Sequence, residues 1–133
     1  MTMWVVVPAY NEAARITVTL DALAAQTDRD FTLLVVDNNS LDHTTDVVRA
    51  YGKMPVRLIV EPHKGVGCAV DTGFRHAIAN GATLLARTDA DCLPRPGWVA
   101  AAREALHANP GLVAGRIVAR RDEHGVFGRA VFR

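Results

Sequence analysis

The sequence predicts an α/β protein, a three-layer sandwich in which helices cover both faces of a mostly parallel sheet. Two observations predict this class. Apolar runs rich in β-branched residues recur along the chain and are continuous rather than alternating, which is typical of strands buried on both faces. Segments with helical spacing of apolar residues lie between these runs, and alternating strands and helices build right-handed crossovers in a parallel sheet. The length of 133 residues, half of them apolar, favours one domain over residues 1–133.

Five runs are predicted to be strands: Met3 to Val7, Phe31 to Val36, Val56 to Val60, Thr83 to Ala86 and Leu112 to Val118. Four helices are predicted between them, on the apolar sets Ile16, Leu20 and Leu23; Val47, Val48 and Tyr51; Val66, Val70, Phe74 and Ala77; and Val99, Ala102 and Leu106.

Residues that cap or end helices support these boundaries. Asp42 is expected to cap the second helix and Gly52 to end it. Asn80-Gly81 is expected to close the third helix. Pro94 and Pro96 predict an extended approach to the fourth helix, which begins near Trp98.

Charge and cysteine content exclude several classes of protein. The 15 Lys and Arg nearly balance the 14 Asp and Glu, so no long-range field would recruit nucleic acid. Cys68 and Cys92 lack metal-type spacing, and a chain of this length needs no disulfide scaffold.

No apolar run reaches the length of a transmembrane segment. We expect a protein of the cytoplasm, either free or peripheral to the inner face of the membrane.

Polar loops follow the first four predicted strands and, in a parallel sheet, face one crevice. They read Pro8-Ala9-Tyr10-Asn11-Glu12, Asp37-Asn38-Asn39-Ser40, Glu61-Pro62-His63-Lys64-Gly65 and Thr88-Asp89-Ala90-Asp91. Together they supply acceptors, an aromatic face and a cation, the set that a nucleoside diphosphate needs. Simpler interpretations stay open: the second loop as a turn, Tyr10 as a packing residue and Lys64 as a solvated lysine.

Asp89 and Asp91 form the sharpest pattern in the chain. Like charges this close oppose each other's ionisation, and a divalent cation between them would remove the conflict. Alternate residues at a strand end point the same way, so both carboxylates can face one ion while Ala90 points into the protein. The alternative is a solvated turn.

Gly65-Val66-Gly67 follows a strand and opens a helix, as in dinucleotide-binding folds, but Val70 replaces the third glycine. The pattern is weak evidence for a dinucleotide site.

Four segments, in order, resemble the amino-terminal half of a family 2 glycosyltransferase with the A-type nucleotide-sugar-binding fold: "VVVPAYNEAARITVTLDALAAQT", "LLVVDNNSLDHTTDVV", "EPHKGVGCAVDTGFRHA" and "LLARTDADCLPRPGWV". The resemblance implies a Rossmann-like sandwich of the nucleotide-diphospho-sugar transferase type, truncated to its donor-binding part. It implies an inverting, metal-dependent enzyme that transfers a sugar from a nucleotide-diphosphate sugar to an unknown acceptor.

The resemblance also assigns roles to residues. Pro8, Ala9, Tyr10, Asn11 and Glu12 would line the pocket for base and ribose. Asp37 would contact the nucleoside, and Lys64 would lie near base or phosphate. Asp89-Ala90-Asp91 matches the DxD motif, with Asp89 on ribose or metal-bound water and Asp91 on a Mg or Mn ion that bridges the diphosphate.

Two departures from the family pattern matter. Asn38 stands where members often carry a second acid, and since an amide both accepts and donates, uridine, thymidine and guanosine donors stay open. The family's catalytic base normally follows the DxD motif by a long stretch, and no residue here matches it. Asp122 and Glu123 are predicted to lie in a salt-bridged turn.

The apolar residues of the last segment, Gly125 to Arg133, would pack against an acceptor-binding half. Val126, Phe127, Val131 and Phe132 are therefore expected to form an exposed patch and to promote self-association.

Three other functions compete with a glycosyltransferase. A sugar nucleotidyltransferase would need a glycine- and arginine-rich loop where this chain has Pro8-Ala9-Tyr10. A dinucleotide oxidoreductase would need a glycine turn after the first strand. A non-catalytic or truncated module that only binds nucleotide is the main alternative.

Overall fold

The structure, a computed structural model, describes residues 2–109, 111, 117–119 and 130–132. Its centre is a four-stranded sheet in the order β3-β2-β1-β4, with every pairing parallel. The strands are β1 (Met3–Ala9), β2 (Phe31–Asp37), β3 (Arg57–Val60) and β4 (Leu84–Arg87). The first four predicted strands are confirmed, with their ends moved by one or two residues.

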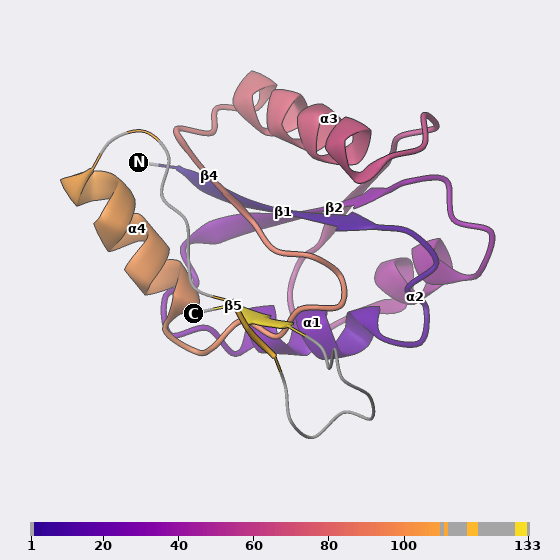
Figure 1. Ribbon diagram of the computed structural model, residues 1–133, viewed down its shortest axis with the longest axis horizontal. Helices are drawn as coiled ribbons and strands as arrows, with labels where there is room; N and C mark the ends of the chain where they lie inside the picture. The colour runs from indigo at the N-terminus through magenta and orange to yellow at the C-terminus, as the bar shows by residue number, and fades with distance from the viewer. Residues whose placement is uncertain (1, 110, 112–116, 120–129, 133) are drawn as a thin grey trace.

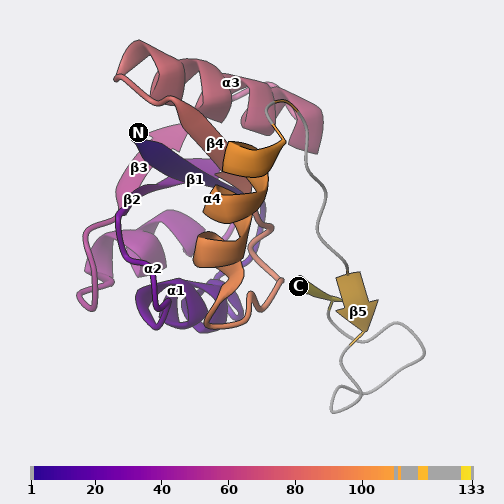
Figure 2. The same cartoon turned by 90° about the vertical axis from the view of Figure 1, so that its left-hand side faces the viewer.

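Helices cover both faces of the sheet, which confirms the predicted three layers (Figures 1 and 2). One face carries α3 (Val66–Ala79), and the other carries α1 (Ile16–Ala24), α2 (Thr44–Ala50) and α4 (Trp98–Ala108). Alternate residues of β1 divide between the two cores: Met3, Val5 and Val7 pack towards α1 and α4, whereas Trp4 and Val6 pack under α3.

Burial on both faces holds for the two central strands and not for the outer ones. Every residue of β1 is buried, and so are the last five residues of β2. β3 and β4 are only partly buried along their four residues each, contrary to the prediction. Among the described residues each has a strand neighbour on one side only.

The fifth predicted strand is found in part, but it does not join the parallel sheet. β5 (Ile117–Ala119) pairs antiparallel with β6 (Ala130–Phe132) in a separate two-stranded sheet. An apolar run indicates a strand without specifying the strand that it pairs with, so this pairing was not predicted. Residues 112–116, and with them the start of the predicted strand, lie outside the described residues.

The predicted turn at Asp122 and Glu123 also lies outside the described residues, as do Val126 and Phe127. Val131 and Phe132 lie in β6. The exposed patch and the self-association therefore stay predictions.

The helix ends lie near the predicted capping residues, but His43 and not Asp42 occupies the cap position of α2, which has no side-chain cap bond. The Asp42 carboxylate accepts a hydrogen bond from the Thr44 N–H at 3.0 Å, just before α2. α2 ends at Ala50, two residues before Gly52. α3 ends before Asn80, and Gly81 adopts a φ of +94°, which glycine tolerates best.

The buried face of α3 matches the predicted one at Val70 and Ala77 and differs elsewhere. It consists of Ala69, Val70, Gly73 and Ala77, whereas Val66 is 54% exposed. Small residues face the sheet because α3 lies close to it, so the larger apolar side chains lie at the margins of the contact. None of the described helices has both the length and the hydropathy to cross a bilayer.

Candidate functional site

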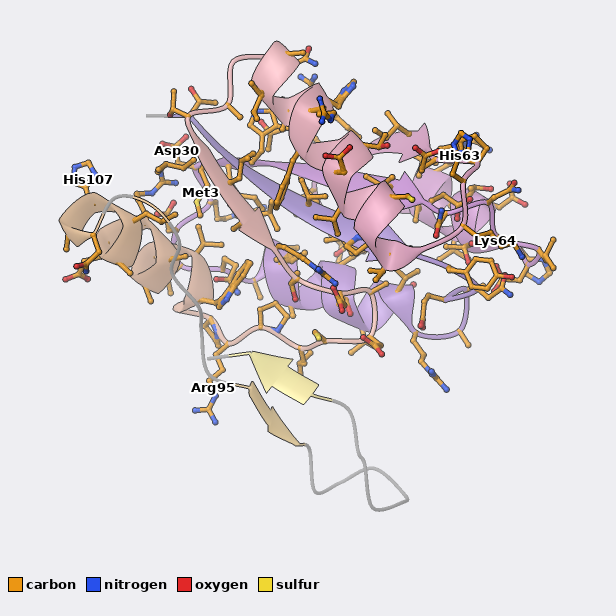
Figure 3. All side chains as sticks on the ribbon, turned by 45° about the horizontal axis from the view of Figure 1, so that its top comes forward. Met3, Asp30, His63, Lys64, Arg95 and His107 are labelled. Carbon is orange, nitrogen blue, oxygen red and sulfur yellow. The ribbon has the colours of Figure 1, made fainter. Side chains whose placement is uncertain are left out.

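A cavity of about 440 Å³ opens at the carboxyl edge of the sheet. Its lining comes from all four strand-end loops and the start of α3: Pro8, Ala9, Tyr10, Glu12, Asn38, Lys64, Gly65, Val66, Ala69, Asp89, Ala90 and Asp91. Figure 3 shows Lys64 and His63 at the end of the molecule opposite Met3, which begins β1. The parallel order of the strands brings these loops to one edge.

Two predicted site residues, Asp37 and Asn11, are not part of this lining. The Asp37 carboxylate is buried and accepts hydrogen bonds from the N–H and the hydroxyl of Ser40, at 3.0 and 2.6 Å. The Asn11 side-chain oxygen accepts from the N–H of Leu41 at 2.8 Å. Both side chains therefore bond neighbouring loop residues behind the cavity, as the interpretation of the second loop as a turn expects. The contact of Asp37 with a nucleoside stays a prediction.

Asn38 lines the cavity, but its amide is engaged by the loop that precedes α3. The amide nitrogen donates to the carbonyl oxygens of Glu61 and His63, at 3.0 and 2.7 Å. The amide oxygen accepts from the N–H of Gly65 at 2.9 Å. These three bonds fix the loop that carries Lys64.

Glu61 fastens the same loop to α3. One carboxylate oxygen accepts from the hydroxyl of Thr72 at 2.6 Å, and the other accepts from the N–H of His63 at 3.0 Å. These bonds, led by the one from Thr72, lower the pKa of Glu61. The loop is thus held from β2 by Asn38 and from α3 by Thr72.

Tyr10 and Lys64 meet across the cavity from different loops. The Lys64 Nζ donates to the Tyr10 hydroxyl at 3.2 Å and lies 5.0 Å from the centre of the aromatic ring. Tyr10 is 40% exposed. Lys64 is itself exposed, and the pair combines an aromatic surface with a positive charge on the cavity wall.

The two aspartates stand on either side of a buried residue, as predicted. Ala90 packs into the core, while Asp89 and Asp91 line the cavity. The Arg87 guanidinium lies 2.9 Å from the Asp89 carboxylate, through Nε. Cys92 Sγ lies 3.8 Å from an Asp91 oxygen, and burial raises the pKa of this thiol, which favours its protonated form.

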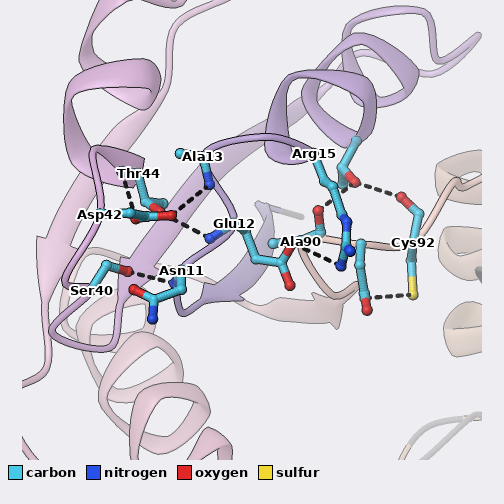
Figure 4. A network of polar contacts seen from close by, with 11 residues as sticks. Asn11, Glu12, Ala13, Arg15, Ser40, Asp42, Thr44, Ala90 and Cys92 are labelled. Carbon is cyan, nitrogen blue, oxygen red and sulfur yellow. Dashed lines mark hydrogen bonds and ion pairs between the residues drawn. The ribbon is translucent and has the colours of Figure 1, made fainter.

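Glu12 brings a third carboxylate to the cavity. Its Oε2 is buried and has no hydrogen-bond partner among the described residues, the Arg15 guanidinium being 4.0 Å away. Burial, followed by the negative charge of Asp91, raises the pKa of Glu12. Figure 4 shows Glu12 between the contacts of Asp42 and Thr44 on one side and those of Ala90 and Cys92 on the other. The loop that carries Tyr10 and Glu12 and the loop that carries Asp89 and Asp91 thus both contribute to the cavity wall.

The donor set suits a divalent cation that arrives with a ligand. No group of three or more His, Cys, Asp and Glu in the described part of the chain is arranged to hold a metal ion. Asp89 and Asp91 are hard oxygen donors, and Mg²⁺ in nucleotide sites is held by one or two carboxylates together with phosphates and water. The residues therefore fit an ion that is shared with a diphosphate.

Two buried polar residues that bond the segment after Asp89 were not predicted. The hydroxyl of Thr19 lies 2.9 Å from the carbonyl oxygen of Ala90 and 2.6 Å from that of Cys92. Gln26 bonds Arg95 near the end of the same loop and Val99 in the first turn of α4. A signal was present for Thr19, since a buried polar residue lies on the apolar face of the first helix and must find a partner.

The model of the family "Glycosyl transferase family 2" matches residues 4–132. The chain is similar to the glycosyltransferase AglE of Haloferax volcanii, with 37% identity over 101 residues, covering 71% of this chain and 32% of that protein. It is also similar to a validoxylamine A glucosyltransferase of Streptomyces hygroscopicus, with 39% identity over 111 residues, covering 80% of this chain and 25% of that protein. The chain therefore spans a quarter to a third of the length of these relatives.

Solved structures show the same fold. A mannosyltransferase of Pyrobaculum calidifontis, PcManGT, in complex with GDP-Man and Mn²⁺ is 33% identical with a TM-score of 0.71, covering 90% of this chain and 36% of that one. TarS 1–349 of S. aureus in complex with UDP has a TM-score of 0.75 at 22% identity, covering 94% of this chain and 38% of that one. With the family match over nearly the whole chain, these findings show that the protein belongs to glycosyl transferase family 2.

Proposed function

We propose that residues 1–133 form the donor-binding domain of an inverting, metal-dependent glycosyltransferase. The observation that carries the proposal is the composition of the cavity wall. All four strand-end loops contribute to it, and they place the aspartate pair, Glu12, Tyr10 and Lys64 around one space of about 440 Å³. That volume lies within the range of small-molecule sites, and its polar residues match a nucleotide-diphosphate sugar.

The proposed roles follow from charge and position. Asp91, with Asp89, would hold a Mg or Mn ion, which as a Lewis acid stabilises the charge that develops on a departing nucleoside diphosphate. Lys64 would place its ammonium group near phosphate or base, beside the ring of Tyr10. Pro8, Ala9, Asn11 and Glu12 would form or support the wall for base and ribose. Asp37 would support that wall from behind through Ser40.

Relatives suggest the nucleotides to test first. UDP is present in the TarS complex, and GDP-Man with Mn²⁺ in the PcManGT complex. In this chain the Asn38 amide makes three bonds to the neighbouring loop, so Asn38 does not by itself favour one base. UDP, GDP and TDP are therefore the probes, each with Mn²⁺ and with Mg²⁺.

None of the described residues is assigned as the base that activates the acceptor. General-base assistance contributes about a hundred- to ten-thousandfold in rate, so donor binding and sugar transfer are separate questions for this chain. The main alternative, a nucleotide-binding module without turnover, predicts bound donor and no released nucleoside diphosphate on long incubation.

We place the protein in the cytoplasm, and we retain self-association through residues 125–133 as a prediction.

Calorimetric titration of UDP, GDP and TDP into the purified chain with Mn²⁺ tests the proposal. We expect saturable binding of one nucleotide, which EDTA and Asp91→Asn each weaken by about tenfold or more, the worth of roughly 1.4 kcal/mol. The matched control is Asp71→Asn, which removes an exposed carboxylate paired with Arg75 on the outside of α3. Absence of binding, or equal binding by Asp91→Asn, would contradict the proposal.

A further inference from the structure

The segment that carries the aspartate pair has little regular structure of its own. Residues 88–97, between β4 and α4, belong to neither a strand nor a helix. An irregular segment at the edge of a sheet needs other contacts to hold a defined shape. In this chain several of those contacts come from α1 and the residues just after it, which contribute nothing to the cavity lining.

Thr19 of α1 fixes the backbone on both sides of Asp91. The hydroxyl lies within donating distance of two carbonyl oxygens, at 2.9 Å from Ala90 and 2.6 Å from Cys92. These residues directly precede and follow Asp91 in the chain. Thr19 is 1% exposed, so water cannot readily replace its hydroxyl as the donor.

Gln26 holds the far end of the same segment. Its amide nitrogen donates to the carbonyl oxygen of Arg95 at 2.7 Å, and its amide oxygen accepts from the N–H of Val99 at 2.9 Å. The N–H of Thr27 donates to the carbonyl oxygen of Pro96 at 2.9 Å. The segment after Asp89 is therefore attached to the α1 region at two places.

The start of α1 is bonded to the loop that forms the other wall of the cavity. The carbonyl oxygen of Glu12 accepts from the N–H groups of Arg15 and Ile16, at 3.0 and 2.8 Å, so the helix begins on the loop that contains Tyr10 and Glu12. A helix is stiff over this length. α1 thus joins the loop proposed for base and ribose to the loop proposed for the metal (Figure 4).

We propose that Thr19 is a positioning residue that orients Asp91 towards the cation of the donor complex. The inference rests on the proposed function and adds a residue outside the cavity to it. By sharing its one hydroxyl hydrogen between the carbonyl groups before and after Asp91, Thr19 limits the rotation of the backbone that aims the carboxylate. Loss of the hydroxyl should reduce the affinity gained from the metal and leave the metal-independent contacts of the nucleotide in place.

The test compares Thr19→Val, which keeps the shape and removes the donor, with Thr19→Ser, which keeps the donor. Affinity for UDP, or for GDP where GDP binds more tightly, is measured with Mn²⁺ and with EDTA, and Tm is recorded for each protein. We expect the gain in nucleotide affinity from Mn²⁺ to be about tenfold smaller in Thr19→Val than in the unaltered chain. The affinity in EDTA should stay within about twofold of that of the unaltered chain. Thr19→Ser should retain most of the gain.

Thr83→Val is the matched control, because its hydroxyl bonds Thr2 at the opposite end of β4. It should leave the Mn²⁺-dependent gain unchanged. Thr19→Ala serves where Thr19→Val does not fold, since it removes the donor without placing a methyl group against the two carbonyls.

Three outcomes would overturn the inference. A full Mn²⁺ gain in the Thr19→Val or Thr19→Ala protein would show that the hydroxyl does not position Asp91. A loss that is equal with Mn²⁺ and with EDTA, together with a lower Tm, would assign Thr19 a structural role only. Absence of Mn²⁺-dependent binding in the unaltered chain would contradict the proposed function itself, and this inference with it.

Discussion

At the scale of single residues, Asn38 lines the cavity while its amide group bonds the neighbouring loop. Family members often carry an acid at this position, which the resemblance associates with the nucleotide. Here both amide hydrogens go to the carbonyl oxygens of Glu61 and His63, and the oxygen accepts from Gly65. An amide satisfies this arrangement and a carboxylate does not, because it has no hydrogen to donate.

Asn38→Asp is therefore expected to loosen the loop that carries Lys64. A carboxylate would face two carbonyl oxygens within a 6% exposed site, and we expect a loss of about 1–3 kcal/mol in the free energy of unfolding. Nucleotide affinity should fall as well. Denaturant unfolding and calorimetry measure the two effects. Asn109→Asp, at an exposed position after α4, is the control. Unchanged stability with an altered preference among UDP, GDP and TDP would instead indicate direct reading of the base.

The aspartate pair and Glu12 show a second residue-level feature. The cavity gathers three carboxylates, and the raised pKa of Glu12 reflects its burial and the charge of Asp91. Without a cation this concentration of negative charge is unfavourable, and Arg87 and Arg15 offset it only in part. A divalent cation would remove the conflict, which is the physical reason for the proposed metal dependence.

At the scale of elements, the approach of α3 to the sheet depends on Gly73. A Cβ atom at this position would lie 2.6 Å from Val6 Cγ1 and 2.8 Å from Val36 Cγ2, both in the fully buried centre of the sheet. β-Branched side chains have few alternative rotamers, so the clash cannot be relieved by a simple rotation. The glycine therefore sets how near α3, and with it the Val66 and Ala69 wall of the cavity, lies to β1.

Gly73→Ala should lower the free energy of unfolding by about 1–2 kcal/mol, because the cost of overpacking exceeds the gain in helix propensity. Gly67→Ala in the same helix is the matched control. No atom lies within 4 Å of a Cβ built there, and we expect it to be neutral or to stabilise by up to about 1 kcal/mol. Denaturant unfolding measures both variants. Equal stability changes would show that α3 can move away from the sheet without cost.

At the scale of the whole molecule, the cavity exists only when four loops meet at one edge of the folded sheet. A ligand that contacts several of them binds the folded state and not the unfolded chain, and so it raises the melting temperature. The described residues offer no group of three or more metal ligands, so a metal alone should have little effect.

Thermal unfolding with Mn²⁺, with UDP or GDP, and with both together tests this cooperation. At a hundredfold excess over Kd, the complex should be stabilised by about 2.7 kcal/mol, which corresponds to a rise in Tm on the order of 10 °C. Mn²⁺ alone should change Tm far less than the pair does, and EDTA should reverse the difference. A rise with Mn²⁺ alone as large as with both would mean that the protein holds the ion without a diphosphate.

Local patterns in the sequence predicted much of this structure. Apolar runs and helical spacings specified the order of elements through α4, and polar residues at the strand ends indicated the edge at which the cavity opens. The Asp89-Ala90-Asp91 motif and the segments around it indicated a family 2 glycosyltransferase, and the family model matches residues 4–132. These features depend on residues near one another in the chain, which is why a single sequence contains them.

Tertiary structure decided the partners of individual groups. The bonds of Asn38 reach residues 23–27 positions away, and those of Thr19 reach across 71 and 73 positions. The contact at Gly73 and the raised pKa of Glu12 are of the same kind. Each depends on distance and on exclusion of water between segments far apart in the chain, and no local pattern of residues encodes those quantities.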